Sequence, residues 1–438
     1  MMALSVFSLS VAYLTHGRFI DFVSSTPEQL DQLAAACHPA TFGRGNQDAY
    51  DESYRKAPKM DTTDFAAQFD PTMSGLIRII EENLLQGQTE KMSIRSEIYK
   101  LNVYSDVLSP APPPYFSAFP RLTGKDSFFV AHKDTPRGTA MLGSLVVVYP
   151  ARHQGGELVL RHKGRKWILD ANALTSFPPS PSIAYVAFYS DIEHEVLKVT
   201  AGSRVTLTYN LYLAHSLASR APVLSSLSTA FVKPNLKDAR TFQATLCRLL
   251  KSPEFMPEGG TLAFNFAHLY PITFDTKLQE MTAYLKGEDA HVYQSCRELE
   301  LEPVLRMISS EKPSGQPSHG AMLEIPIQDQ SYDYGVSSYE RHLVKELGGI
   351  RVNLSNCGIA TDSDEDDSGR YGDGLYQGGG SLDREEGDSR ERCEHTDFTQ
   401  SVNELKDIAM AYGNECTAEF VYCSPCLIVR IDPAVDRV

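Results

Sequence analysis

The segment YSDIEHEVLKVTAGSRVTLTYNLYL, residues 189–213, decides the fold because apolar and polar side chains alternate along most of it. Alternation with a period of two is typical of β-strands that bury one face. Five further short segments between residues 97 and 190 carry the same pattern, and Gly, Pro, Ser or Asp residues separate them. Because no helical pattern lies between these strands, the sequence predicts an antiparallel barrel or jelly roll.

Length and charge bound the class of protein. The chain has 438 residues, more than one compact core usually takes, which favours two domains or one enlarged domain. A net charge of −15 argues against a nucleic-acid partner, which would favour a basic face. Eight cysteines are too sparse for a disulfide framework, and this usage fits a reducing compartment.

Targeting and membrane signals are weak throughout. The chain has no run of eighteen or more apolar residues that could span a membrane. Its N-terminus has no basic residues before a moderately apolar stretch and no clear cleavage site for a signal peptide. We therefore expect a cytoplasmic protein without a membrane partner, and the sequence leaves its oligomeric state open.

The pattern along the chain changes twice, which predicts three regions and an α+β fold class. Residues 1–93 read as an N-terminal region of helices and loops, and residues 94–215 as the jelly-roll domain. Residues 216–438 show a mixed α/β pattern. Within them, the stretch from about 361 to 395 is acidic and rich in Gly and Ser, so we expect it to be disordered.

Two features of the predicted jelly roll stand apart from its strands. Residues 106–124 contain many prolines and no periodicity, and the sequence leaves open whether they form a lid over the barrel mouth or reflect a gene-model error. Trp167 is the only tryptophan and lies on an alternating strand, where we expect it to pack in the core.

Three residues have the spacing of a metal site. In an extended strand, His132 and Asp134 would point to the same face, because positions i and i+2 share a side. His194 lies near the start of a later strand, which a barrel can bring opposite the first pair. Two imidazoles and one carboxylate form the facial triad of non-haem Fe(II) oxygenases, and a zinc site could use the same three ligands.

Arg204 and Thr206 add a second element to this pattern. They follow His194 across a Gly-Ser turn and again occupy positions i and i+2 of a strand. A guanidinium can bind a carboxylate through two parallel hydrogen bonds, and a hydroxyl can add a third. This arrangement is what a dicarboxylate co-substrate needs at its far end while its near end chelates a metal.

These residues resemble those of the Fe(II)- and 2-oxoglutarate-dependent dioxygenases, and specifically the prolyl-4-hydroxylase-like group. The resemblance rests on His132-x-Asp134, on His194, on Arg204-x-Thr206 and on GGEL at residues 155–158, which precedes a strand. Within the group, four segments of the chain are most similar to uncharacterised fungal members: DTPRG, GSLVV, FYSDIEHEV and RVTLTYNLY. The resemblance implies a double-stranded β-helix, the jelly roll of this family, as the core.

The resemblance also implies roles for individual residues. His132, Asp134 and His194 would ligate Fe(II), with no catalytic side chain beyond these ligands. Arg204 and Thr206 would bind the distal carboxylate of 2-oxoglutarate, and Tyr104 matches a family tyrosine by its place on the preceding strand. Prolyl hydroxylases use a lysine where this chain has Arg204, which puts a prolyl substrate in doubt.

The implied reaction uses O2 to oxidise an unactivated C–H bond while 2-oxoglutarate is decarboxylated to succinate. Its substrate is a protein side chain or a small metabolite, which the sequence does not identify, and Arg137 is a candidate substrate contact at the barrel mouth. Two alternatives remain open. One is a catalytically inactive jelly roll that serves as an interaction module, and the other is a different metal-dependent enzyme on the same three ligands.

Overall fold

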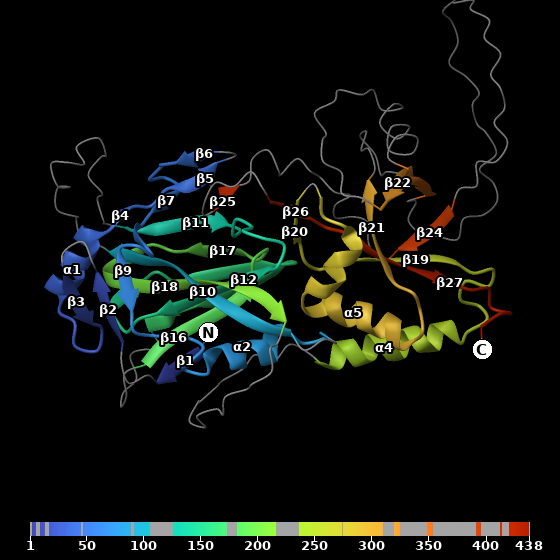
Figure 1. The fold of residues 1–438 in the computed structure, drawn as a ribbon, viewed down its shortest axis with the longest axis horizontal. Helices are drawn as coiled ribbons and strands as arrows, with labels where there is room; N and C mark the ends of the chain where they lie inside the picture. The colour runs from blue at the N-terminus through green and yellow to red at the C-terminus, as the bar shows by residue number, and fades with distance from the viewer. Residues whose placement is uncertain are drawn as a thin grey trace, which may run out of the picture.

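The computed structural model places the jelly-roll region and the C-terminal region side by side, with an array of strands at one end and a helix-covered barrel at the other (Figure 1). The part of the chain that the structure describes comprises residues 2–5, 9–13, 17–44, 47–88, 92–105, 126–172, 182–215, 236–273, 275–309, 319–324, 348–353, 391–395, 412–413 and 420–437. The proline-rich segment 106–124 lies outside these residues.

The larger sheet of the first region has eight strands, and all of its pairings are antiparallel. Its two longest strands, β10 (Met92–Ser105) and β18 (Val199–His215), pair along most of their length. The path across the sheet runs β1 (Met2–Ser5), β16 (Ser182–Tyr189), β12 (Met141–Val148), β18, β10, β8 (Pro58–Asp61) and β4 (His38–Pro39), and β13 (His153–Gly155) also pairs with β18.

The smaller sheet has five strands in the order β15-β14-β17-β11-β7, again antiparallel. An apolar cluster between the sheets joins side chains of both, such as Leu158 and Val196 from the smaller sheet and Phe188 from the larger. The strands of the smaller sheet are β15 (Arg165–Leu169), β14 (Leu158–His162), β17 (Glu193–Val196), β11 (Phe128–His132) and β7 (Arg55–Lys56). Because the cluster draws on both sheets, the two sheets form the walls of one core.

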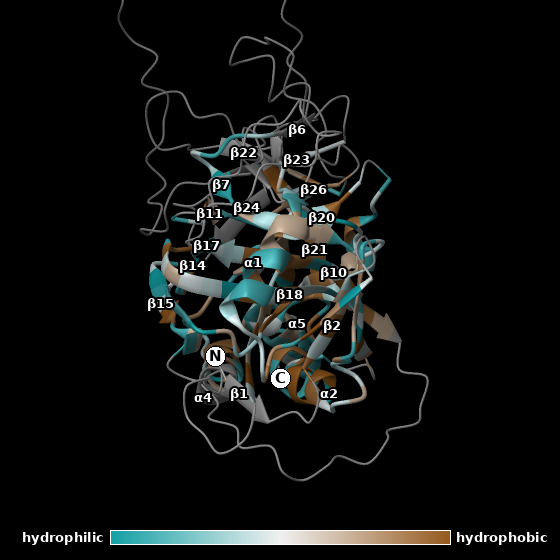
Figure 2. Ribbon diagram, turned by 90° about the vertical axis from the view of Figure 1, so that its left-hand side faces the viewer, coloured by the Kyte–Doolittle hydropathy of each residue, from teal (hydrophilic) through white to brown (hydrophobic). Residues whose placement is uncertain are grey.

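Two helices cover the outer face of the larger sheet. Helix α1 (Pro27–Ala36) contacts β10 and β18, and helix α2 (Leu76–Leu84) contacts β10 and β16. Thr26 caps α1 because its hydroxyl accepts a hydrogen bond from the Gln29 amide, while the Gln29 side chain accepts one from the Thr26 amide. The polar residues of α1 are teal in Figure 2. A small sheet of β3 (Arg18–Asp21), β2 (Ser10–Tyr13) and β9 (Phe65–Ala67) completes this end.

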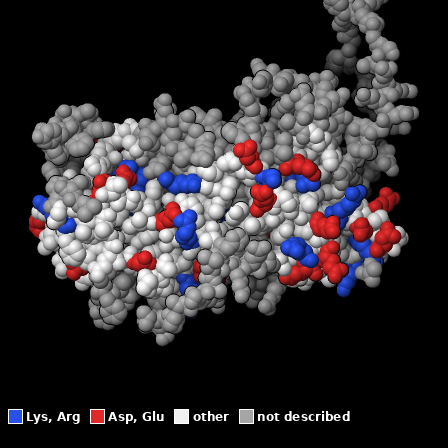
Figure 3. Space-filling view, viewed as in Figure 1, with Lys and Arg blue, Asp and Glu red and all other residues white. Residues whose placement is uncertain are grey.

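The C-terminal region has its own apolar core around Leu305, Leu427 and Val429. Its strands close into a barrel in the order β19 (Gly260–Asn265), β24 (Glu391–His395), β23 (Ile350–Asn353), β22 (His319–Leu323), β21 (Val304–Ser309) and β27 (Cys426–Ile431). Helices α4 (Leu236–Leu250) and α5 (Gly287–Glu298) and the 3-10 helix η3 (Leu278–Tyr284) lie beside it. Charged side chains of both signs gather on this region in Figure 3.

Two short pairings add to these sheets. Strand β20 (Tyr270–Ile272) pairs with β26 (Val421–Cys423) in the C-terminal region. Strand β5 (Phe42–Arg44) pairs with both β6 (Gln47–Ala49) and β25 (Tyr412–Gly413), so a segment near the C-terminus joins one near the N-terminus.

The structure confirms the strands expected between residues 97 and 213 and a mixed α/β architecture with mostly antiparallel sheets. It differs at the N-terminus, where residues 1–93 contain short strands besides the two helices, and three of them, β1, β4 and β8, extend the larger sheet. These strands have two to four residues, too few to show a period.

The stretch 361–390, most of the segment expected to be disordered, lies outside the described residues, and residues 391–395 form β24, which pairs with β19 and β23. Trp167 does not pack in the core, because its strand β15 is an edge strand whose residues are largely exposed, and 38% of Trp167 is accessible to solvent. No helix within the described ranges has the length and apolar character needed to cross a bilayer.

Candidate metal and anion site

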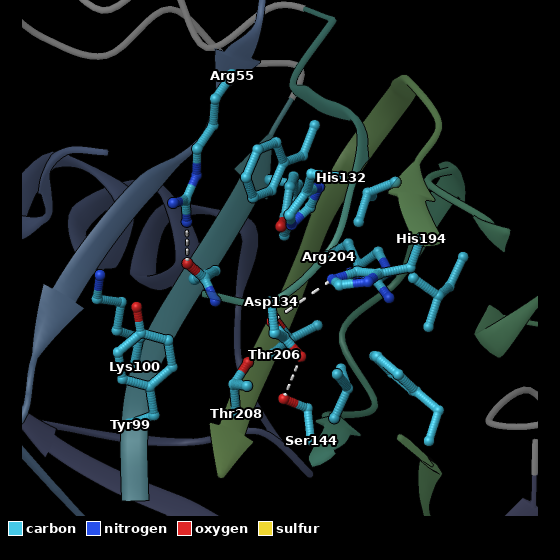
Figure 4. A pocket seen from close by; sticks show the side chains of 17 residues that line it. Arg55, Tyr99, Lys100, His132, Asp134, Ser144, His194, Arg204, Thr206 and Thr208 are labelled. Atoms are coloured by element: carbon cyan, nitrogen blue, oxygen red, sulfur yellow. Dashed lines mark hydrogen bonds and ion pairs between the residues drawn. The ribbon is translucent and has the colours of Figure 1, made fainter. Parts of the chain in front are cut away.

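A cavity lies between the two sheets, and side chains of both line it (Figure 4). Its polar lining includes each residue expected to hold a metal or a co-substrate. The polar and ionisable residues are Arg55, Tyr99, Lys100, Asn102, Tyr104, His132, Asp134, Ser144, His194, Arg204, Thr206 and Thr208, and apolar side chains fill the space between them.

His132 and His194 face each other because β11 and β17 are paired at these two residues. Their ring centroids lie 4.2 Å apart, and both side chains are buried. The Nδ1 atom of His132 lies 2.8 Å from the Val130 carbonyl oxygen, and that of His194 lies 3.0 Å from the Ile192 carbonyl oxygen. A carbonyl only accepts hydrogen bonds, so both Nδ1 atoms carry a proton, and in the neutral imidazole this leaves the Nε2 lone pair as the metal ligand.

Burial reinforces the neutral form of His132. It lowers the pKa of this imidazole well below the usual 6.5, and the nearby His194 and Arg55 act in the same direction, against the hydrogen bond to Val130. A histidine that stays neutral at physiological pH is ready to bind a metal without first losing a proton.

Asp134 reaches the same cavity from beyond the end of its strand. Strand β11 ends at His132, so strand pairing alone does not position the carboxylate. Instead the Asp134 amide donates to the Ser190 carbonyl oxygen at 3.2 Å, and its Oδ2 accepts from the Ser144 hydroxyl at 2.6 Å. Its Oδ1 lies 3.8 Å from Nε2 of His194, which brings two of the three expected ligands together.

Arg204 is the most unusual residue of the cavity. Only 1% of it is exposed, and within the described part of the chain neither its Nε nor its Nη2 has a hydrogen-bond partner. Burial lowers the pKa of Arg204, yet a guanidinium starts so high that it remains charged. A buried charge of this kind is costly unless an anion accompanies it, so the arginine marks a place for one.

The surroundings of Arg204 are built to accommodate it. Tyr104 lies opposite it on β10, with the guanidinium carbon 5.4 Å from the centre of the ring. Thr206 lines the same cavity two residues further along β18 and is buried. Gly156, in the GGEL motif, leaves the room that the arginine needs, because a Cβ there would come within 2.9 Å of the Arg204 Cδ.

Arg137 lies beside the cavity rather than in its lining. Its Nη2 donates to the Tyr99 hydroxyl at 2.8 Å, and its guanidinium carbon lies 4.4 Å from the centre of the Tyr99 ring. Tyr99 itself lines the cavity, so Arg137 reaches it through the tyrosine.

A second group of possible metal ligands was not expected from the sequence. Among the residues that the structure describes, His162, Asp191 and His268 have ligand atoms within 4.8 Å of one another. A cation already accompanies the carboxylate, because Nζ of Lys286 lies 2.9 Å from Asp191 Oδ1, while Nδ1 of His268 lies 3.1 Å from Oδ2. Burial alone would raise the pKa of Asp191, but Lys286 and His268 outweigh it and hold that pKa far below its usual value.

Comparison with known proteins gives no family assignment. No family model matches the chain, and no curated protein matches its sequence. Similar solved structures include an oxidoreductase of the 2OG-Fe(II) oxygenase family from Burkholderia pseudomallei, with 19% identity and a TM-score of 0.24 over 42% of this chain and 78% of that one. A prolyl-4-hydroxylase from Pseudomonas putida has 18% identity and a TM-score of 0.22 over 43% and 88%.

A third solved structure, YcfD, a ribosomal oxygenase from Escherichia coli in complex with cobalt and succinic acid, has 10% identity and a TM-score of 0.17 over 77% of this chain and 90% of that one. Since all three TM-scores are below 0.5, the function proposed below is argued from the residues of the cavity and not from these neighbours.

Proposed function

We propose that the chain is an Fe(II)- and 2-oxoglutarate-dependent dioxygenase whose core, residues 94–215, is a double-stranded β-helix. The observation that supports this most strongly is Arg204, a buried cation in the same cavity as two histidines and a carboxylate. Glu157 raises its pKa from a distance, but among the described residues no carboxylate accepts a hydrogen bond from its Nε or Nη2. A metal site with a dedicated anion site beside it matches a co-substrate that chelates iron at one end and carries a carboxylate at the other.

His132, Asp134 and His194 would hold the iron, and the residues around them fit that task. Both histidines present Nε2 to the cavity, and Ser144 orients the carboxylate of Asp134. When bound, Fe(II) with 2-oxoglutarate and O2 would supply the oxidation of an unactivated C–H bond, with succinate and CO2 as the other products.

The remaining residues would bind and orient the co-substrate. Arg204 would pair with the distal carboxylate of 2-oxoglutarate, Thr206 would donate a hydrogen bond to it, and Tyr104 would close the same end of the cavity. The apolar side chains of Phe129, Leu158 and Val196 help to exclude water, which strengthens every charge interaction inside. Arg137 would act on the primary substrate indirectly, by holding Tyr99, which lines the cavity.

The proposal is tested by titrating metal-free protein with Fe(II) under anaerobic conditions, then adding 2-oxoglutarate and measuring succinate after admitting O2. We expect one iron per chain and iron-dependent succinate formation. His132→Ala and His194→Ala should lose the iron while keeping the fold, since both side chains face the cavity. Stoichiometric iron in either variant would refute the ligand assignment, and iron without 2-oxoglutarate binding would favour a different metal-dependent enzyme. Absence of both would favour an interaction module.

A further inference from the structure

A second buried arginine lies in the same cavity and has no role in the proposed binding of iron or 2-oxoglutarate. Arg55, on β7, is 3% exposed, and its strand pairs with β11 at Phe129. Its guanidinium carbon lies 4.4 Å from the centre of the Phe129 ring, and that ring stacks on His132 with centroids 3.6 Å apart. The charge of Arg55 is therefore only one aromatic ring away from an expected metal ligand (Figure 4).

The hydrogen bonds of Arg55 hold its side chain in place without neutralising it. Nη2 donates to the Asn102 side-chain oxygen at 2.9 Å, and Nη1 donates to the Thr41 carbonyl oxygen at 3.2 Å. Both acceptors are uncharged, and no partner for Nε exists among the described residues. Over the same residues no carboxylate forms an ion pair with Arg55, so this is a fixed, buried positive charge whose Nε–H has no acceptor there.

The charges of the cavity lining do not balance. Among the described residues of the lining, Arg55, Lys100 and Arg204 are cationic and Asp134 is the one carboxylate, so these residues carry 3 − 1 = 2 positive charges with neutral histidines. The iron and the co-substrate of the proposed function add two positive and two negative charges and leave that excess unchanged. Without Lys100 in the count, one positive charge still remains.

We infer that the primary substrate carries an acidic group, a carboxylate or a phosphate, and that Arg55 binds it. This inference rests on the proposed function, because it assigns 2-oxoglutarate to Arg204 and leaves Arg55 for the substrate. The two arginines come from different sheets, Arg55 from the smaller and Arg204 from the larger, so they reach the cavity from different walls. Asn102 is a positioning residue, since it fixes the guanidinium.

The test measures binding and needs no turnover. Protein loaded anaerobically with Fe(II) and 2-oxoglutarate is titrated by calorimetry with N-acetylglutamate α-amide, with its neutral isostere N-acetylglutamine α-amide, and with inorganic phosphate. We expect one of the two anions to bind about ten- to a hundredfold more tightly than the neutral probe, the range for one hydrogen-bonded charge. Tighter binding of N-acetylglutamate α-amide would identify the acidic group of the substrate as a carboxylate, and tighter binding of phosphate would identify it as a phosphate.

Arg55→Met should abolish the preference for the anion and change the affinity for 2-oxoglutarate by less than about twofold. Arg55→Gln, which is neutral but retains hydrogen-bonding groups, should behave in the same way and covers the case in which the methionine variant does not fold. Arg161→Met is the matched control, because Arg161 pairs with Glu193 and Glu195 away from the cavity lining, and its loss should change neither affinity.

Three results would overturn the inference: equal binding of the charged and neutral probes, an anion preference that survives in both Arg55 variants, or a loss of 2-oxoglutarate affinity in those variants. The last result would assign Arg55 to the co-substrate. The phosphate titration is repeated on metal-free protein, so that an anion preference lost with Arg55 is seen even where iron and 2-oxoglutarate fail to bind. An anion preference that depends on Arg55, without binding of iron or 2-oxoglutarate, would contradict the proposed function and leave the assignment of Arg55 to an anion standing.

Discussion

The hydroxyl of Tyr422 donates a hydrogen bond of 2.9 Å to the backbone carbonyl of Asp134, across 288 residues of sequence. Tyr422 belongs to β26 of the C-terminal region, and Asp134 is an expected metal ligand of the jelly-roll region. Lys286 makes a parallel contact, because its Nζ donates to Ser190, whose carbonyl oxygen accepts from the Asp134 amide. The C-terminal region thus holds the loop that carries the carboxylate from two sides.

Removing the Tyr422 hydroxyl should loosen this loop. We expect Tyr422→Phe to weaken metal binding by up to about tenfold, the lower end of the effect seen for partners of metal ligands. The free energy of unfolding should fall by about 1 kcal/mol, the value of one hydrogen bond. Metal titration and urea unfolding of the same preparation measure the two quantities.

Tyr209→Phe is the control for that variant. The Tyr209 hydroxyl donates to the Phe69 carbonyl oxygen at 2.9 Å, and Tyr209 does not line the cavity, so its loss should lower stability without changing metal affinity. If Tyr422→Phe and Tyr209→Phe bind metal equally well, the Tyr422 contact is structural only.

Breaking the pair between Lys286 and Asp191 should strongly destabilise the fold. Both side chains are 2% exposed, and removal of one partner leaves the other charge buried and uncompensated. Lys286→Met should therefore cost about 3–5 kcal/mol in the free energy of unfolding. Lys277→Met serves as the comparison, because the Lys277–Glu280 pair is 79% and 69% exposed and should cost less than about 1 kcal/mol. Similar urea midpoints for the two variants would show that the buried pair is not needed.

Stability of the metal-free protein should depend on pH through His132. Its pKa in the folded chain lies well below 6.5, mainly because it is buried, whereas the unfolded chain titrates near 6.5. Below that pH the unfolded chain binds a proton that the folded chain does not, so the free energy of unfolding falls as pH falls. The contribution of His132 is up to about 1.4 kcal/mol per pH unit.

Urea unfolding between pH 7.5 and pH 5 measures this dependence. Burial also lowers the pKa of His153 and His162, so the informative quantity is the difference between the parent and His132→Asn. We expect a shallower slope in the variant, and equal slopes would contradict a neutral, buried His132.

The strands of the jelly roll and the shared cavity could be predicted from the sequence, because both follow from the alternation along single strands. Arg204 and Thr206 share a face of β18 for that reason, and pairing of β11 with β17 then brings His132 to His194. Asp134 lies beyond the end of β11, and its backbone hydrogen bond to Ser190 could not be predicted from any local sequence pattern.

The remaining features depend on contacts between distant segments. Arg55 lies in the N-terminal region, and only the pairing of the two-residue strand β7 with β11 places it in the cavity. The ion pair of Asp191 with Lys286 joins two regions of the chain, and the sequence pattern of neither region predicts a contact with the other. Strand β24 was missed because its sequence, ERCEH, has no apolar alternation.

Arg204 carries the central claim, and its variants test that claim most directly through the affinity of the Fe(II)-loaded protein for 2-oxoglutarate. The visible charge-transfer band of the anaerobic complex reports binding. Because Arg204 is proposed to contact only the distal carboxylate, Arg204→Ala should keep iron and lose roughly thirty-fold to nearly a thousand-fold in affinity, equivalent to about 2–4 kcal/mol. Arg204→Lys should retain part of it, since the charge remains while the second hydrogen bond is lost. Binding of 2-oxoglutarate by Arg204→Ala as tightly as by the parent would contradict the account.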